Sequence, residues 1–115
     1  MAQAFDESEL LEHVDHDLSF LADTVRMLEM DAPPLMQQVN TAVAAGDAPA
    51  VGRTAHALKG MISNFCAPAA QALALEVERL GKSGDCAAAA AAAARLESSL
   101  QLLIAELGTF IKARS

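Results

Sequence analysis

The feature that most constrains the fold of this 115-residue chain is a long run of apolar side chains spaced three or four residues apart. The run comprises Leu18, Leu21, Val25, Leu28, Ala32, Leu35, Val39 and Ala42. This spacing places all of them on one face of an α-helix, as expected for a helix that packs in a bundle. Pro33 and Pro34 interrupt the run without changing its phase. The sequence therefore predicts either one kinked helix or two collinear helices over residues 16–45.

Residues that break helices divide the rest of the chain into shorter helical segments. We place these segments at residues 6–13, 48–66, 68–81 and 85–112. Asp6 can cap the first segment, and Glu9 three residues later completes the pattern of a capping box. The sequence AAGD at residues 44–47 supplies a glycine stop for one helix and an aspartate cap for the next. The short polar turn GKSGD at residues 81–85 indicates that the two helices it joins are antiparallel neighbours.

The later segments carry apolar stripes of their own. The side chains expected in the core are Val51, Ala55, Leu58, Ile62, Phe65, Leu73, Val77, Leu80, Leu96, Leu100, Leu103, Leu107 and Phe110. The alanine run from Ala87 to Ala94 favours helix strongly but supplies little burial. Signals for β-strands are nearly absent. The sequence predicts an all-α fold: one domain over residues 1–115, built as an antiparallel up-and-down four-helix bundle with a short extra N-terminal helix.

Charge and composition exclude several classes of function. The formal net charge is −7, and nine acidic residues against one base lie within residues 1–31, so we expect neither a nucleic-acid partner nor a membrane partner. No segment approaches the roughly 20 apolar residues of a membrane span. The acidic N-terminus lacks the apolar run of a secretory signal. We therefore expect a cytoplasmic protein in which Cys66 and Cys86 are reduced thiols in the core.

The main candidate for chemistry is His56, within the sequence RTAHALKG at residues 53–60. It follows Ala55 of the predicted buried stripe, which places the imidazole at the flank of the bundle. Gly52 and Gly60 lie one helical turn before and after it, although a glycine inside a helix costs about 1 kcal/mol relative to alanine. We interpret these glycines as leaving the approach to an exposed histidine open. Glycines also permit close packing of helices, so this interpretation has an alternative.

Two further side chains fit a nucleophilic role for this histidine. A neutral imidazole is a competent nucleophile, and Lys59 on the same face would place a cation near a group attached to it. The second ring nitrogen needs an acceptor to fix its tautomer. Glu78 is the candidate, because it is one residue from Val77 in the neighbouring buried stripe. The alternative is that Glu78 only pairs with Lys82, four residues later.

The motif AHALKG, with AAGD about ten residues upstream, resembles the histidine-containing phosphotransfer (HPt) domain of bacterial two-component phosphorelays. His56, Lys59 and Gly60 match the His-x-x-Lys-Gly pattern of that family. Glu78 corresponds to its polar residue 22 positions after the histidine, and Lys82 to a position that is sometimes basic. The resemblance covers nearly the whole chain. One departure is Cys66, where the family usually has a second glycine, and this departure puts the tightness of the turn in doubt.

This resemblance implies a phosphoryl carrier and no enzyme with a nucleotide site of its own. His56 would accept a phosphoryl group from a receiver-domain aspartate, or from a sensor histidine kinase or hybrid kinase, and pass it to another receiver aspartate. Lys59 would stabilise the phosphoryl group and Glu78 would orient the ring. The chain would need no cofactor, because the magnesium ion would reside in the receiver domain. The residues expected to contact partners are Gly52, Arg53, Gly60, Ser63, Asn64 and Lys82.

The sequence is also compatible with two other functions. The chain could be a helical adaptor that binds signalling partners while His56 is never phosphorylated. His13 and His16 are three residues apart among acids and could hold zinc, but no further ligand is suggested, so we expect no metal site. We expect a monomer. The sequence does not tell a free-standing protein from a domain of a hybrid kinase.

Overall fold

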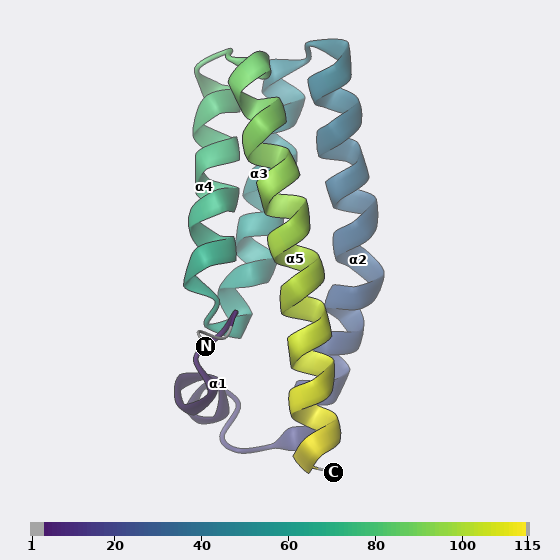
Figure 1. The fold of residues 1–115 in the computed structure, drawn as a ribbon, viewed down its shortest axis with the longest axis vertical. Helices are drawn as coiled ribbons and strands as arrows, with labels where there is room; N and C mark the ends of the chain where they lie inside the picture. Colours follow the sequence, from purple (N-terminus) through teal and green to yellow (C-terminus); the bar gives the residue numbers. More distant parts are fainter. Residues whose placement is uncertain (1–3, 115) are drawn as a thin grey trace.

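Five α-helices and one short 3-10 turn make up residues 4–114, the part of the chain that the computed structural model describes. They are α1 (Glu7–His13), α2 (Leu18–Ala45), α3 (Ala48–Ile62), the 3-10 turn η1 (Ser63–Phe65), α4 (Pro68–Lys82) and α5 (Cys86–Arg114). Helices α2 to α5 run alternately up and down, and each packs against its neighbours in the order α2, α3, α4, α5 and back to α2 (Figure 1). No strand occurs in the described residues. The predicted all-α four-helix bundle with a short N-terminal helix is confirmed.

Helix α2 settles the question of the two prolines. It is one continuous helix from Leu18 to Ala45 with Pro33 and Pro34 inside it. Both proline residues are exposed. Glu29 and Met30, four residues earlier, are exposed as well, so water can reach the carbonyl groups that the prolines leave without a helical donor.

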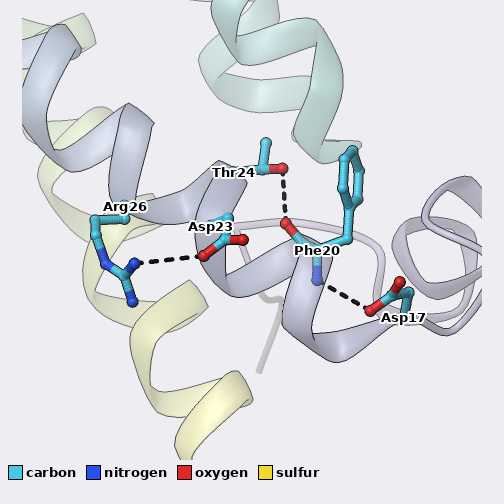
Figure 2. Close-up of polar contacts among 5 residues, drawn as sticks. All are labelled: Asp17, Phe20, Asp23, Thr24 and Arg26. Atoms are coloured by element: carbon cyan, nitrogen blue, oxygen red, sulfur yellow. Dashed lines mark hydrogen bonds and ion pairs between the residues drawn. The ribbon is translucent and has the colours of Figure 1, made fainter.

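The first turn of α2 shows why the helix begins where it does. Asp17 is its N-cap, and Oδ1 of Asp17 accepts a hydrogen bond from the backbone N–H of Phe20 at 3.0 Å (Figure 2). His16 was predicted inside this helix but lies before it, with a left-handed backbone (φ 57°) that a helix does not contain. Asp15 is left-handed as well (φ 53°). This pair of residues turns the chain sharply between α1 and α2.

The turn between α2 and α3 follows the AAGD sequence closely. Gly46 ends α2 in the left-handed conformation (φ 68°), and the backbone N–H of Asp47 donates to the carbonyl of Ala42 at 2.9 Å. The side chain of Asp47 then caps α3 by accepting from the N–H of Ala50 at 3.2 Å. Pro49 occupies the first turn of α3, where its missing N–H costs nothing. Gly46 and Asp47 therefore fix the residue at which α3 begins, and with it the position of His56 along the bundle.

Helix α3 ends earlier than predicted, and Cys66 explains the difference. The α-helix stops at Ile62, η1 continues to Phe65, and Cys66 adopts the left-handed conformation (φ 52°, ψ 49°). This is the geometry that a glycine would favour, so the turn keeps its tightness although a cysteine occupies it. Cys66 and Cys86 are half-buried free thiols, not core residues as predicted. Burial and the nearby carboxylates of Glu9 and Asp6 raise the pKa of the Cys66 thiol, which keeps it protonated.

The core agrees with the predicted stripes in α3 and α5 and differs in α2 and α4. In α2, Met36 is buried and Leu35 only half-buried. In α4, Leu73 and Leu80 are half-buried, whereas Ala70, Ala74, Val77 and Gly81 are fully buried. Gly81 faces Gly52 of α3, and its lack of a side chain allows these two helices to approach closely. In α5 the alanine run contributes Ala89, Ala92 and Ala93 to the core.

Helix α1 closes the end of the bundle at which α3 and α4 meet (Figure 1). Leu10 of α1 is buried, as are Phe5 before the helix and Val14 directly after it, and the ring of Phe5 packs edge-on against Phe110 of α5 with centroids 5.3 Å apart. The backbone N–H of Asp6 donates to the carbonyl of Cys66 at 2.9 Å. The side chain of Asp6 also caps α1 as predicted, by accepting from the N–H of Glu9.

Candidate functional site

His56 projects from the middle of α3 on its solvent side. Its side chain is 67% exposed, while the neighbouring Ala55 is fully buried. Because residues one apart in a helix point about 100° away from each other, a buried residue 55 places residue 56 at the flank of the bundle. Nδ1 of His56 lies 2.9 Å from Oε2 of Glu78 on α4. One ring nitrogen is therefore engaged with the protein, and the ring itself remains open to a visiting molecule.

Glu78 is a buried carboxylate that three donors share. Its side chain is 3% exposed. Nζ of Lys59 lies 2.7 Å from Oε1, and Nζ of Lys82 lies 2.9 Å from Oε2, the oxygen that also contacts His56. Hydrogen bonds from Lys59 and Lys82, and less strongly from His56, lower the pKa of Glu78 from 4.5 to about 2 against the opposing effect of burial. Glu78 is therefore ionised throughout the physiological pH range.

An ionised Glu78 determines which nitrogen of His56 is free. A carboxylate can only accept hydrogen bonds, so the short contact with Oε2 requires that Nδ1 carries the proton. In the neutral ring, the lone pair is then on Nε2. Nε2 is therefore the ring atom with a free lone pair, and the side chain that carries it is 67% exposed.

Two glycines set the distance between α3 and α4 at this site. A Cβ atom at Gly81 would lie 2.5 Å from the backbone nitrogen of Gly52 and 2.9 Å from its Cα. The helices therefore touch backbone to backbone at this point, and Glu78 one turn before Gly81 is brought within hydrogen-bond distance of His56 one turn after Gly52. Sequence reasoning missed Gly81. Its signal was present as a small residue in register with Ala70, Ala74 and Val77.

The structure separates the two glycines that flank His56. Gly60 is exposed, and a Cβ atom there would meet nothing within 4 Å, so its surface is open next to the ring. Gly52 was predicted to contact a partner but is buried; a Cβ atom there would touch Cγ of Lys82 at 3.5 Å. Gly52 therefore lies in the contact between α3 and α4, as in the alternative that the sequence left open, and it does not open the approach to the ring.

The remaining predicted residues lie on the same exposed side of α3 and η1. Arg53, Ser63 and Asn64 are exposed. Oγ of Ser63 donates to the carbonyl of Gly60 at 2.6 Å, and Nδ2 of Asn64 to the carbonyl of Met61 at 3.4 Å. The side chains of Ser63 and Asn64 are therefore engaged with their own helix end. They are available to a partner only through their outward surfaces.

A hollow of about 410 Å³ lies beside the imidazole. Its lining residues are Ala48, Pro49, Gly52, Arg53, His56, Glu78 and Lys82. A larger hollow of about 510 Å³ lies between α2 and α5, where Glu97 is its ionisable lining residue. The smaller hollow is the candidate site, because its lining includes His56 together with Glu78 and Lys82.

The alternative metal site receives no further ligand. His13 and His16 are exposed, the first at the end of α1 and the second in the turn after it. Within residues 4–114, no three histidine, cysteine, aspartate or glutamate side chains gather in a way that could hold a metal ion. In the same residues, no helix is both long and apolar enough to cross a membrane.

Comparison with known proteins identifies a family and a similar fold. The family model described as "Hpt domain" matches residues 23–108, which include α3, α4 and most of α2 and α5. Among solved structures, the chain is similar to the crystal structure of histidine-containing phosphotransfer protein B (HptB) from Pseudomonas aeruginosa PAO1. The TM-score is 0.88 over 98% of each chain at 21% sequence identity, a likeness of fold. No curated protein matches the chain.

Proposed function

Because the chain belongs to the Hpt domain family, we propose that it is a phosphoryl carrier that uses His56 to exchange a phosphoryl group with the aspartate of receiver domains. The observation that carries this proposal is the exposed imidazole whose Nδ1 is held by a buried, ionised carboxylate. That arrangement leaves a lone pair on Nε2 facing outward. Donors and acceptors of the phosphoryl group are a sensor histidine kinase or hybrid kinase and receiver domains.

In the transfer step, Nε2 of His56 attacks the phosphorus of an aspartyl phosphate on the receiver. The P–N bond forms as the P–O bond to the aspartate breaks, and the electron pair of that bond stays on the carboxylate. The ring then carries a positive charge, because Nδ1 keeps its proton. Glu78 accepts from Nδ1 and stabilises that charge, as the buried aspartate of a serine-protease triad does for its histidine.

The positively charged ring also makes the reverse step possible. When a receiver aspartate attacks the phosphorus, the P–N bond breaks and its electron pair returns to Nε2, so the leaving group is a neutral imidazole. Because Glu78 acts on the same ring in both directions, the phosphoryl group can be received and passed on. Magnesium and most of the stabilisation of the transferring group come from the receiver domain, and the carrier chain needs no cofactor.

Lys59 stabilises the phosphoryl group in this proposal. In the unphosphorylated protein its Nζ is paired with Oε1 of Glu78, and the side chain is 25% exposed. A phosphoryl group adds nearly two negative charges next to this ammonium, which gives Nζ a second partner. We expect Lys59→Ala to slow transfer by about tenfold while the helix content by circular dichroism stays unchanged. A variant with the wild-type transfer rate would remove Lys59 from the mechanism.

The surface that receives the partner lies around His56. It comprises Arg53, Gly60, Ser63, Asn64 and Lys82, all exposed on α3, η1 and α4. Gly60 offers a place without a side chain next to the ring.

The proposal is tested by transfer of radioactive phosphate from phosphorylated receiver domains to the wild-type protein, His56→Gln and the control His16→Gln. We expect label on the wild type and the control and none on His56→Gln, with the label labile in acid as a phosphohistidine is. Equal label on all three proteins, or no label from any of several receivers, would overturn the proposal. In the second case, binding of a receiver without transfer would identify the chain as a helical adaptor.

A further inference from the structure

Lys82 contacts the same oxygen as the histidine. Oε2 of Glu78 lies 2.9 Å from Nδ1 of His56 and 2.9 Å from Nζ of Lys82. Oε1 is paired with Lys59. A single negative charge therefore faces two ammonium groups and a ring that can become a third cation.

A carboxylate alone next to an imidazole has two effects that conflict in a nucleophile. It fixes the tautomer by accepting from Nδ1, which is needed. It also favours the protonated ring, because an opposite charge nearby stabilises the charged form. A protonated ring has no lone pair on Nε2 and cannot attack phosphorus. A carrier that is ready at neutral pH has to keep the first effect and suppress the second.

We infer that Lys82 is a positioning residue that keeps His56 neutral, because its ammonium shares Oε2 of Glu78 with Nδ1 of the ring. The carboxylate then fixes the tautomer of the ring without favouring its protonated form. This inference rests on the proposed function for its biological meaning, but the electrostatic effect exists in the unphosphorylated protein. It gives Lys82 a role inside the site in addition to any contact with a partner.

The position of Lys82 is built into the helix contact. A Cβ atom at residue 52 would lie 3.5 Å from Cγ of Lys82, an ordinary van der Waals contact, so the aliphatic stem of Lys82 lies beside the backbone of α3. The charged groups that face the ring are Arg53 and Lys59 on α3 and Glu78 and Lys82 on α4. The hollow has no lining residue from α2 or α5. Lys59 contacts Oε1 of Glu78, and Lys82 is the cation that shares Oε2 with Nδ1 of His56.

The inference is tested by nuclear magnetic resonance of the ring nitrogens during a pH titration of the unphosphorylated protein. We expect Lys82→Gln to raise the pH at which the His56 ring protonates by about half a unit to one unit, from the loss of a unit charge near the ring. His13 and His16 act as internal references that do not shift. Arg79→Gln removes an equal charge from an exposed position of α4 and is expected to leave the His56 titration unchanged. Lys82→Arg, which keeps a cation, is expected to restore most of the wild-type behaviour.

Phosphotransfer supplies the second measurement. At pH values below the midpoints of the His56 titration in both proteins, Lys82→Gln should accept phosphate about threefold to tenfold more slowly than wild type. At high pH the two rates should be equal. A rate lowered equally at every pH, with an unchanged ring titration, would show that Lys82 only contacts the partner and would overturn the inference. If no receiver phosphorylates the wild-type protein, the proposed function fails, while the ring titration still decides the role of Lys82.

Discussion

The contact between Gly81 and Gly52 leads to a prediction about a single methyl group. In Gly81→Ala the new Cβ would lie 2.5 Å from the nitrogen of Gly52, 2.9 Å from its Cα and 3.0 Å from Cγ1 of Val51. These atoms belong to backbone or to a buried valine, so none can rotate away. Comfortable contacts need about 3.5 Å, and therefore α3 and α4 must separate by about 1 Å at this point.

The cost of this separation follows from the site. The hydrogen bond between His56 and Glu78 is 2.9 Å long, and an added 1 Å takes it beyond hydrogen-bond distance. Overpacking of a core costs about 1–3 kcal/mol. Weakened bonds to a buried carboxylate cost about as much again. Alanine returns about 1 kcal/mol through its higher helix propensity. We expect Gly81→Ala to lower the free energy of unfolding by about 3 kcal/mol and to slow phosphotransfer to His56.

Urea unfolding at pH 7, followed by circular dichroism, measures the change. The matched control is Gly108→Ala in the C-terminal part of α5, where a Cβ atom would meet nothing within 4 Å. The same substitution there should raise the free energy of unfolding by about 0.5–1 kcal/mol. If Gly81→Ala is as stable as Gly108→Ala, the two helices do not depend on a glycine at their crossing and the reasoning is wrong.

Three further predictions concern single positions. The pKa of Glu78 is lowered in the folded protein, so its ionisation contributes stability that is complete above pH 4.5 and is lost as the pH falls to about 2. In urea unfolding, wild type should be more stable than Glu78→Gln by at most about 3 kcal/mol, because Lys82 and His56 are exposed to solvent, and this difference should vanish over that pH range. A difference that does not depend on pH would contradict the lowered pKa. Cys66→Gly should raise the free energy of unfolding by about 0.5–1 kcal/mol, seen as a higher midpoint of thermal unfolding, because it removes a side chain from a left-handed residue. The control Cys86→Gly, at the start of α5, should be slightly destabilising. Equal effects of the two substitutions would show that the backbone at residue 66 is not strained. Gly60→Leu should keep the helix content and weaken receiver binding measured by calorimetry, with Gly60→Ala as the smaller control, and unchanged affinity for the leucine variant would exclude Gly60 from the docking surface.

The fold could be predicted from the sequence wherever large apolar side chains define the packing. In α3 and α5, every residue expected in the core is buried, because leucine, isoleucine and phenylalanine there have no other way to leave water. In α4, the same reasoning chose Leu73 and Leu80, which are half-buried. The packing of that helix is decided by alanine and glycine, whose small size matters only when the distance to the neighbouring helix is known.

The site shows a similar division. His56 could be placed at the flank of the bundle because a buried Ala55 fixes its direction. The pairing of Glu78 with the ring was expected, but its simultaneous contact with Lys59 and Lys82 depends on the spacing of two helices and could not be read from either one. In the sequence, Lys82 offered an alternative partner for Glu78, whereas in the structure it is a further member of one cluster.

The unequal helix lengths divide the molecule into two levels of stability. Helices α2 and α5 have 28 and 29 residues, while α3 and α4 have 15 each, so the longer pair extends roughly 20 Å past the shorter one. Beyond the shorter helices, α1 lies beside the end of α5, where Phe5 packs on Phe110 and Glu7 pairs with Arg114. Amide hydrogens around His56 should therefore exchange with solvent more slowly than those of the overhang, because local opening near α1 can occur while the four-helix level stays folded.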